Sequence, residues 1–363
     1  MDPVFSACRG PRLRGRGLAR DPKRRIAAVA AAMCRESRRS FRGLMAAFLL
    51  GVSLMLPTLA IAQSASPAAT PSAASGDFAG LVDIGGGRRL YLECRGSGSP
   101  TVLLEAGYRS PATVWSDDLV QPDDPRTMVL EGVASFTRVC LYERPGVAAV
   151  LADELHPSRS DPVPMPRTVE AIVADLHALL QAAEVPGPYV LVGHSLGGLM
   201  VRLYQATYPD EVAGMVLVDA FSEKIRDRLR PEEWDAFLAL NAMLPPEMAD
   251  YVDYETIDFA AAVESMAEAE RPLPLPLYVL ARGLPLGATE EGLGFSPDRF
   301  EAAWRLAQDD LAALSPNAGF AVAERSAHYI QLDEPELVIE AVAEVVAAVR
   351  EPGASSPVAS PAP

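Results

Sequence analysis

Short apolar segments alternate with amphipathic ones through most of the chain between residues 77 and 351. Apolar runs of about four to eight residues are typical of buried strands, and apolar residues recurring every three or four positions are typical of half-buried helices. The strand pattern occupies 78–84, 88–94, 101–105, 138–142, 189–192, 215–218, 277–281 and 319–322, and the helix pattern occupies 168–183, 198–208, 300–314 and 335–349. This alternation predicts an α/β domain with a mainly parallel sheet, covered by helices on both faces.

The pattern changes between residues 221 and 270, where helical stretches are interrupted at Pro231 and at Pro245-Pro246. Apolar residues recur there at near-helical spacing: Trp234, Phe237, Leu238, Leu240, Met243, Leu244 and Met248. We expect a helical lid whose apolar underside either packs on the domain or forms the wall of a binding site. Its 13 acidic and four basic residues favour neutral or apolar substrates over anionic ones, although a solvated helix face accounts for the same charges.

Residues 1–62 have the pattern of an export signal. A basic flank at Arg38, Arg39 and Arg42 precedes an apolar run over residues 44–56, and Ala60-Ile61-Ala62 forms an A-x-A cleavage site. We expect cleavage after Ala62 and export to the periplasm or the medium, with residues 37–41 resembling the twin-arginine motif. A permanent anchor is the alternative, but the run is shorter than the roughly 20 residues that span a bilayer. No stable membrane span is expected after cleavage.

Two further segments, 63–76 and 352–363, are rich in Ser, Ala and Pro and are predicted to be a flexible linker and a disordered tail. The folded domain is therefore expected over residues 77–351. It contains Cys94 and Cys140, which are too few for a disulfide framework. They could form one bridge in an oxidising compartment, but we expect two buried, unpaired, small apolar side chains.

Charge and histidine content exclude several classes of function. The chain carries a net charge of −16, and its acidic excess lies after residue 62, so a nucleic-acid partner is not expected. The four histidines are scattered and show no metal-ligand spacing, so the sequence predicts neither a metal site nor a cofactor. The expected partner is a small molecule with a neutral or apolar acyl group.

The strongest chemical motif is Gly193-His194-Ser195-Leu196-Gly197, which fits the G-x-S-x-G nucleophile elbow. An apolar strand precedes it and a predicted helix follows it, which is the context that this motif requires. A tight strand-to-helix turn strains the backbone, and glycines at the flanking positions avoid collisions with side chains. Ser195 is therefore predicted to be a nucleophile at the positive end of a helix, where developing negative charge is stabilised.

A serine nucleophile needs a base, and His328 is the best placed of the four histidines. His156 lies in a Pro-rich segment, His177 lies in a predicted helix, and His194 belongs to the elbow, where we expect local packing or hydrogen bonding. His328 follows the last predicted strand in a loop before the final helix. Loops at the carboxyl ends of parallel strands line the binding crevice, so His328 is predicted to activate Ser195.

These motifs together resemble the α/β-hydrolase family. The resemblance rests on Ser195 in GHSLGG, Asp219 in VLVDA and His328 in SAHYIQLDEP, with LLEAG and YERPG (residues 142–146) as further matches. It extends from about residue 88 to residue 349. It implies the α/β-hydrolase fold, with a mainly parallel eight-stranded sheet flanked by helices and a helical lid at about residues 221–270, after the sixth strand. It also implies a Ser-His-acid hydrolase, usually an esterase or a lipase.

The acid of this predicted triad has more than one candidate. In many family members the acid follows the seventh strand, where the first carboxylates in this chain are Glu290 and Glu291. In other members it follows the sixth strand, where this chain has Asp219. We favour Asp219, because a triad acid must be held on a rigid element in order to orient the histidine.

The oxyanion hole of such an enzyme is formed by two backbone N–H groups. The first is predicted to be Leu196, because it follows the nucleophile in the elbow. The resemblance implies Tyr108 as the second, in the turn Ala106-Gly107-Tyr108, where relatives often have His-Gly. The expected reaction is ester cleavage through an acyl-enzyme on Ser195. Acyl transfer, perhydrolysis and amide cleavage with the same triad, or a non-catalytic binding role, are the alternatives. A serine at position 195 is evidence against the dehalogenase and epoxide-hydrolase reactions of this fold, because those enzymes use a carboxylate nucleophile there.

Overall fold

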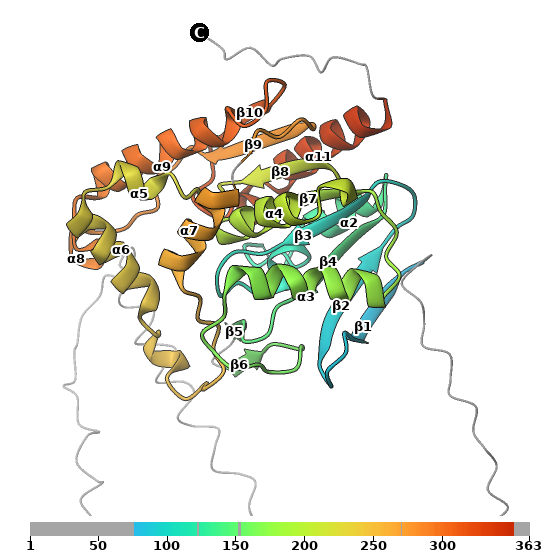
Figure 1. Cartoon of the computed structure of the whole chain (residues 1–363), viewed down its shortest axis with the longest axis horizontal. Helices are drawn as coiled ribbons and strands as arrows, with labels where there is room; N and C mark the ends of the chain where they lie inside the picture. The colour runs from blue at the N-terminus through green and yellow to red at the C-terminus, as the bar shows by residue number, and fades with distance from the viewer. Residues whose placement is uncertain (1–75, 122, 152–153, 270, 352–363) are drawn as a thin grey trace, which may run out of the picture. The chain divides into compact units, whose positions relative to one another are not determined.

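The computed structural model describes residues 76–121, 123–151, 154–269 and 271–351 (Figure 1). The predicted export signal over residues 1–62 and the predicted tail over 352–363 lie outside the described residues, as does the predicted linker except for its last residue. Within the described ranges, no helix combines the length and the apolar character that are needed to cross a bilayer.

One sheet of eight strands organises the described part of the chain, with the order β1-β2-β4-β3-β7-β8-β9-β10. Its strands are β1 (Phe78–Asp83), β2 (Arg89–Arg95), β3 (Thr101–Glu105), β4 (Val139–Glu143), β7 (Tyr189–His194), β8 (Val212–Val218), β9 (Leu277–Arg282) and β10 (Gly319–Ala323). β2 pairs antiparallel with both β1 and β4, and the remaining neighbours are parallel. The predicted mainly parallel, eight-stranded sheet is confirmed.

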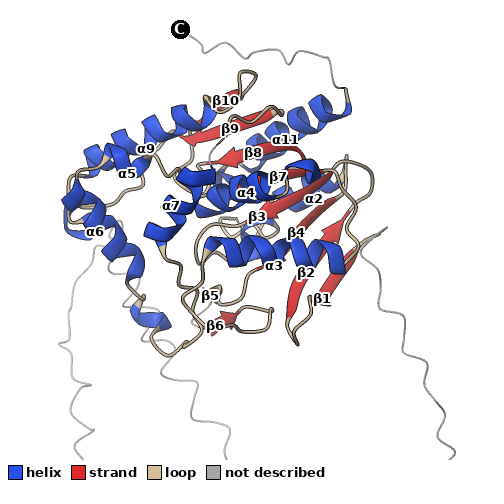
Figure 2. Ribbon diagram, viewed as in Figure 1, coloured by secondary structure: helices blue, strands red, loops and turns tan. Residues whose placement is uncertain are grey.

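Helices cover both faces of this sheet (Figure 2). α3 (Val169–Ala182), α4 (Leu196–Thr207) and α9 (Pro297–Ala312) contribute to one apolar core, whereas α2 (Val129–Ala134) and α11 (Pro335–Arg350) contribute to the other. Successive strand residues alternate between the two cores: Leu191 packs in the first, and Val190 and Val192 pack in the second. Because both faces are buried, the central strands are apolar throughout, as the sequence shows.

The segment between β8 and β9 forms a helical insertion. It contains α5 (Ile225–Arg228), α6 (Pro231–Ala242), η3 (Pro246–Met248) and α7 (Phe259–Ala269). The predicted lid at residues 221–270 coincides with this insertion. The apolar face of α6 and α7 packs toward the α4 side of the sheet, because Phe237, Phe259 and Val263 belong to the same core as Leu199.

Several short elements were not predicted from the sequence pattern. They are η1 (Ala112–Trp115), α2, the small hairpin of β5 (Ala148–Leu151) and β6 (Glu154–Pro157), η2 (Pro209–Glu211), α8 (Glu290–Leu293) and α10 (Ile330–Asp333). The helices among them have six residues or fewer, which is too short for a helical period to stand out in the sequence.

The expectation that Cys94 and Cys140 remain unpaired is wrong, because they form a disulfide. The two residues lie directly opposite each other in the antiparallel pairing of β2 with β4, and their Cα atoms are 4.0 Å apart. The sequence does not show that these two strands become neighbours, since β3 lies between them in the chain but not in the sheet.

Candidate active site

Ser195 occupies a strained turn between β7 and α4. Its backbone has φ 53° and ψ −127°, and it is the N-cap residue of α4. The glycines on either side are required by close packing of the backbone. A Cβ atom on Gly193 would lie 2.7 Å from the carbonyl oxygen of Gly197, and one on Gly197 would lie 2.5 Å from the carbonyl oxygen of Ala106. The G-x-S-x-G spacing therefore produces the turn expected from the sequence.

The structure brings His328 and Asp219 together. Asp219 follows β8 directly and is fully buried, and His328 lies in the loop between β10 and α10. The Nδ1 atom of His328 lies 2.6 Å from Oδ2 of Asp219. Because an ionised carboxylate only accepts hydrogen bonds, this contact assigns the proton of neutral His328 to Nδ1 and leaves Nε2 as the acceptor nitrogen. His328 and Ser195 line the same cavity.

Two residues that were not predicted from the sequence also hold Asp219. Nη1 of Arg282 donates to Oδ2 at 2.7 Å, and Nε1 of Trp304 donates to Oδ1 at 2.8 Å. Burial raises the pKa of the Asp219 carboxyl, but the hydrogen bond from His328 and the charges of His328 and Arg282 outweigh burial, so its pKa lies below the usual range. The sequence signal for Arg282 was a charged residue at the end of an otherwise apolar strand.

The alternative acids, Glu290 and Glu291, lie elsewhere in the fold. Both occupy the first turn of the short helix α8 and are exposed to solvent. A solvent-exposed carboxylate on a four-residue helix is less firmly positioned than the buried Asp219. The contact with His328 therefore favours Asp219 over the two glutamates.

The two predicted oxyanion donors lie beside Ser195. Leu196 is the first residue of α4, and both Leu196 and Tyr108 line the cavity that contains Ser195. The loop after β3 approaches Ser195 closely, because a Cβ atom on Gly107 would lie 3.0 Å from Cβ of Ser195. Only glycine fits at that position, which allows the backbone of the loop to pass next to Ser195.

His194 was expected to interact locally but instead contacts the predicted base. Its Nε2 atom lies 2.8 Å from the backbone carbonyl oxygen of His328, and the two rings are 4.6 Å apart between their centres. Burial, followed by the nearby charge of His328, lowers the pKa of His194 to about 3. His194 is therefore neutral near pH 7, donates through Nε2 and holds the loop that carries His328.

The cavity beside Ser195 is largely apolar. Its volume is about 160 Å³. Apolar side chains from the helical insertion, from α9 and from the segment after β9 form its walls: Phe221, Phe237, Leu240, Phe259, Leu286, Leu293, Phe300 and Trp304. The charge of Arg282, which also lines the cavity, is paired with Asp219 and Glu301. Within the described ranges, no cluster of three or more His, Cys, Asp or Glu residues could hold a metal ion.

Comparison with known proteins agrees with this fold. A family model described as alpha/beta hydrolase fold matches residues 143–275, a range that contains both Ser195 and Asp219. The uncharacterized protein YqjL of Bacillus subtilis is 27% identical over 253 residues, which cover 69% of this chain and 85% of YqjL. Lipase LipV of Mycobacterium tuberculosis is 36% identical over 132 residues, which cover 35% of this chain and 49% of the lipase.

Structural similarity extends over most of the described domain. Alpha/beta hydrolase domain-containing protein 10 from mouse superposes with a TM-score of 0.50 at 14% sequence identity, over 75% of this chain and 99% of the mouse chain. Identity this low is evidence of a shared fold alone. Four further curated relatives are 29–35% identical over 132–164 residues, but the chain spans only 17–26% of their length.

Proposed function

The chain belongs to the α/β-hydrolase family, and we propose that it is a serine hydrolase that cleaves carboxylic esters through an acyl-enzyme on Ser195. One observation carries the proposal. Ser195 stands on a strained strand-to-helix turn in the same cavity as His328, whose Nδ1 atom is bonded to the buried carboxylate of Asp219. This arrangement supplies a nucleophile, a base and an acid that orients the base. These are the groups that the transfer of an acyl group to a serine hydroxyl requires.

Each residue then has a defined role in the proposed reaction. Nε2 of His328 removes the proton from Oγ of Ser195 as Oγ attacks the ester carbonyl carbon. The backbone N–H groups of Leu196 and Tyr108 stabilise the negative oxygen of the tetrahedral intermediate. The His328 imidazolium, stabilised by Asp219, gives its proton to the departing alcohol. Water activated by His328 then hydrolyses the acyl-enzyme and regenerates Ser195.

The walls of the cavity indicate the class of substrate. Aromatic and aliphatic side chains surround the space next to Ser195, and the guanidinium of Arg282, which also lines it, is paired with two carboxylates. Such a site favours a neutral ester with an apolar acyl or alcohol group, because burying an unpaired charge there is costly. The similarity to a mycobacterial lipase over about a third of the chain supports the same class.

A labelling and activity experiment tests the proposal. The purified protein is treated with a fluorophosphonate probe, the modified residue is identified by mass spectrometry, and p-nitrophenyl esters of increasing acyl length are assayed beside a matched anilide. We expect labelling on Ser195 and faster cleavage of the esters than of the anilide. A folded protein with neither labelling nor turnover would instead be a binding protein on a hydrolase scaffold.

We also propose that the protein is exported and acts in the periplasm or the medium. The signal-like pattern of residues 1–62 motivates this, and the bridge between Cys94 and Cys140 supports it, because disulfides persist in oxidising compartments. N-terminal sequencing of protein recovered outside the cytoplasm should begin at Gln63. Retention in the cytoplasm of a variant with Arg38→Lys and Arg39→Lys would indicate the twin-arginine route, and unchanged export would indicate the general secretory route.

A further inference from the structure

The YERPG motif at residues 142–146 resembles the family pattern, but the proposed reaction does not use it. Its arginine, Arg144, directly follows β4, and only 2% of its side chain is exposed. Two carboxylates flank its guanidinium group. Glu105 ends β3, and Glu255 belongs to the insertion between η3 and α7, 111 residues further along the chain than Arg144.

All five N–H groups of Arg144 have an acceptor. Nε donates to Oε1 of Glu255 at 2.6 Å, Nη2 donates to Oε2 of Glu255 at 3.0 Å, and Nη1 donates to Oε1 of Glu105. The other two N–H groups bind backbone carbonyls of the loop after β3: Nη1 donates to Ala106 at 2.8 Å and Nη2 donates to Gly107 at 2.6 Å. Because the guanidinium group is planar and all five of its N–H groups donate, it holds the two carboxylates and the two carbonyls in one fixed arrangement.

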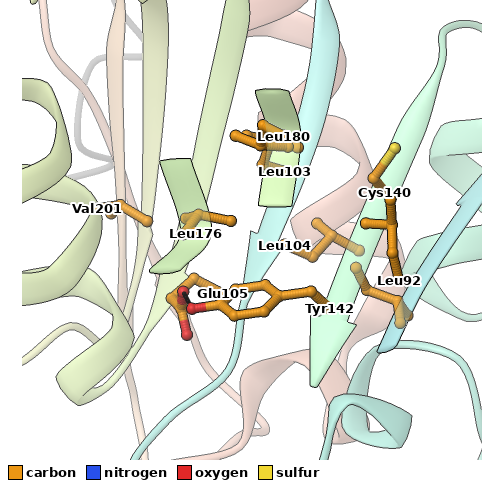
Figure 3. Close-up of a pocket in the computed structure, with 10 residues that line it drawn as sticks. Leu92, Leu103, Leu104, Glu105, Cys140, Tyr142, Leu176, Leu180 and Val201 are labelled. Atoms are coloured by element: carbon orange, nitrogen blue, oxygen red, sulfur yellow. Dashed lines mark hydrogen bonds between the residues drawn. The ribbon is translucent and has the colours of Figure 1, made fainter. Parts of the chain in front are cut away.

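The carboxylates of this cluster have further donors that fix them. The Tyr142 hydroxyl donates to Oε2 of Glu105 at 2.5 Å, and both side chains line a small cavity (Figure 3). The backbone N–H of Arg109 donates to Oε2 of Glu255 at 2.5 Å. Burial raises the pKa of Glu105 despite the opposing charge of Arg144. The loop is thus held at four points, namely the Glu105 side chain, the carbonyls of Ala106 and Gly107, and the Arg109 N–H.

The geometry of the peptide bond connects these contacts to the reaction. The peptide between Gly107 and Tyr108 is trans, so its C=O and N–H point in opposite directions. Arg144 binds the carbonyl oxygen of Gly107 from the buried side of the loop. The N–H of Tyr108 must therefore point away from Arg144, on the side where Gly107 passes Ser195 and Tyr108 lines the cavity.

We propose that Arg144, held by Glu255, is a positioning residue that aims the backbone N–H of Tyr108 at the oxyanion formed on Ser195. This inference rests on the proposed function. It also gives the helical insertion a role in the reaction, because Glu255 connects the insertion to the loop after β3 that carries Tyr108. A cation that merely balanced the charges of two buried carboxylates would not need to bind the carbonyls of Ala106 and Gly107.

The variant Arg144→Lys tests the proposal. Lysine keeps the positive charge between Glu105 and Glu255, but its three donors cannot reproduce the fork that reaches both carbonyls. Loss of one oxyanion donor costs on the order of 10²-fold or more in kcat, so we expect a fall of about that size with KM changed by less than about threefold. The inhibition constant of a trifluoromethyl ketone, which forms a tetrahedral adduct, should rise in proportion to the loss of kcat/KM.

A matched control separates positioning from general stability. Arg167 is also a buried arginine, with 7% of its side chain exposed, and it binds Asp175 at 2.6 Å and the carbonyl of Ala171 at 3.0 Å. Arg167→Lys should lower the melting temperature to an extent similar to Arg144→Lys, while kcat stays within about threefold of the wild type. An equal loss of kcat in both variants would overturn the proposal.

A second variant covers the outcome in which Arg144→Lys does not fold. Glu255→Gln keeps the size of the side chain and weakens the hold on Arg144 and Arg109, so kcat should fall about tenfold at nearly constant KM. Unchanged kcat in a folded Glu255→Gln or Arg144→Lys variant would overturn the positioning role alone, provided that the fluorophosphonate labels Ser195 in the wild type. A wild type that is neither labelled nor active would overturn the proposed function and this inference together.

Discussion

Nδ1 of His328 lies 2.6 Å from Oδ2 of Asp219, although the two residues are 109 positions apart in the sequence. The same oxygen also accepts a hydrogen bond from Arg282 at 2.7 Å. Asp219 follows β8 and His328 follows β10, so the contact forms because parallel strands direct their carboxyl ends to the same edge of the sheet. This contact orients the imidazole that we propose as the base.

Asp219→Asn should lower kcat by roughly 10²–10⁴-fold, because the amide favours the wrong tautomer of His328 and does not stabilise its cation. KM should change much less, since the acid does not contact the substrate. Glu290→Gln and Glu291→Gln are the matched controls and should be close to neutral. Steady-state kinetics of the three variants, with thermal melts, make the comparison. A collapse of activity in one glutamine variant, with Asp219→Asn active, would assign the acid to α8.

Ser195→Ala should abolish ester hydrolysis and fluorophosphonate labelling while the protein remains folded. Removing a triad nucleophile costs on the order of 10⁴-fold or more in rate, and the small side chain of alanine fits wherever serine does. Turnover of the p-nitrophenyl ester preferred by the wild type, measured beside the circular dichroism spectrum, tests this. Retention of wild-type turnover would show that another residue is the nucleophile.

His194 should make the stability of the protein depend on pH between about 6.5 and 3. Its pKa in the folded protein is lowered to about 3, so the unfolded chain binds a proton in this range that the folded protein does not bind. The free energy of unfolding therefore falls as the pH falls, by up to about 1.4 kcal/mol per pH unit.

The variant His194→Gln tests this dependence. Glutamine keeps one donor for the carbonyl of His328 but does not titrate. Urea unfolding at pH 7 and pH 5 should show that the wild type loses up to about 2 kcal/mol more than the variant over this interval. Equal losses in the two proteins would mean that His194 does not carry the effect.

Phe237→Val should shift the preference toward longer acyl groups. Phe237 lines the cavity and packs between Phe221, Phe259 and Phe300, so a smaller side chain lengthens the space next to Ser195. Each methylene buried contributes about 0.8 kcal/mol, so two additional methylenes should raise the ratio of kcat/KM for long over short esters roughly tenfold. Phe136→Val, on the other face of the sheet, is the control. An unchanged acyl-length profile would place the acyl group elsewhere.

Replacing Cys94 and Cys140 together by alanine should destabilise the protein without affecting catalysis. The bridge joins positions 46 residues apart, and constraining a loop of this size in the unfolded chain is worth about 2–4 kcal/mol. Urea unfolding with and without a reductant measures the effect: the reductant should destabilise the wild type and leave the double variant unchanged. A wild type that is insensitive to reductant under unfolding conditions would mean that the bridge is absent.

The sequence by itself determined the layered α/β architecture and the turn that carries Ser195. Both depend on local information. The apolar run of β7 marks a strand that is buried on both faces, and the glycines around Ser195 mark a backbone too crowded for side chains. α4 begins at Leu196, two residues before the predicted start, because Ser195 itself is the N-cap residue. His328 and Asp219 could be proposed from their places after predicted strands, with Glu290 and Glu291 open as alternatives to Asp219.

The tertiary structure alone decided which distant residues meet. Cys94 pairs with Cys140 because β2 and β4 are neighbours in that register, and Arg144 reaches Glu255 because the insertion returns over the loop after β3. Hydrophobic periodicity predicts whether a residue is buried, and the prediction uses only the residues near it in the sequence. Contacts across 46 to 111 positions depend instead on strand order, register and loop closure, which are properties of the folded chain as a whole.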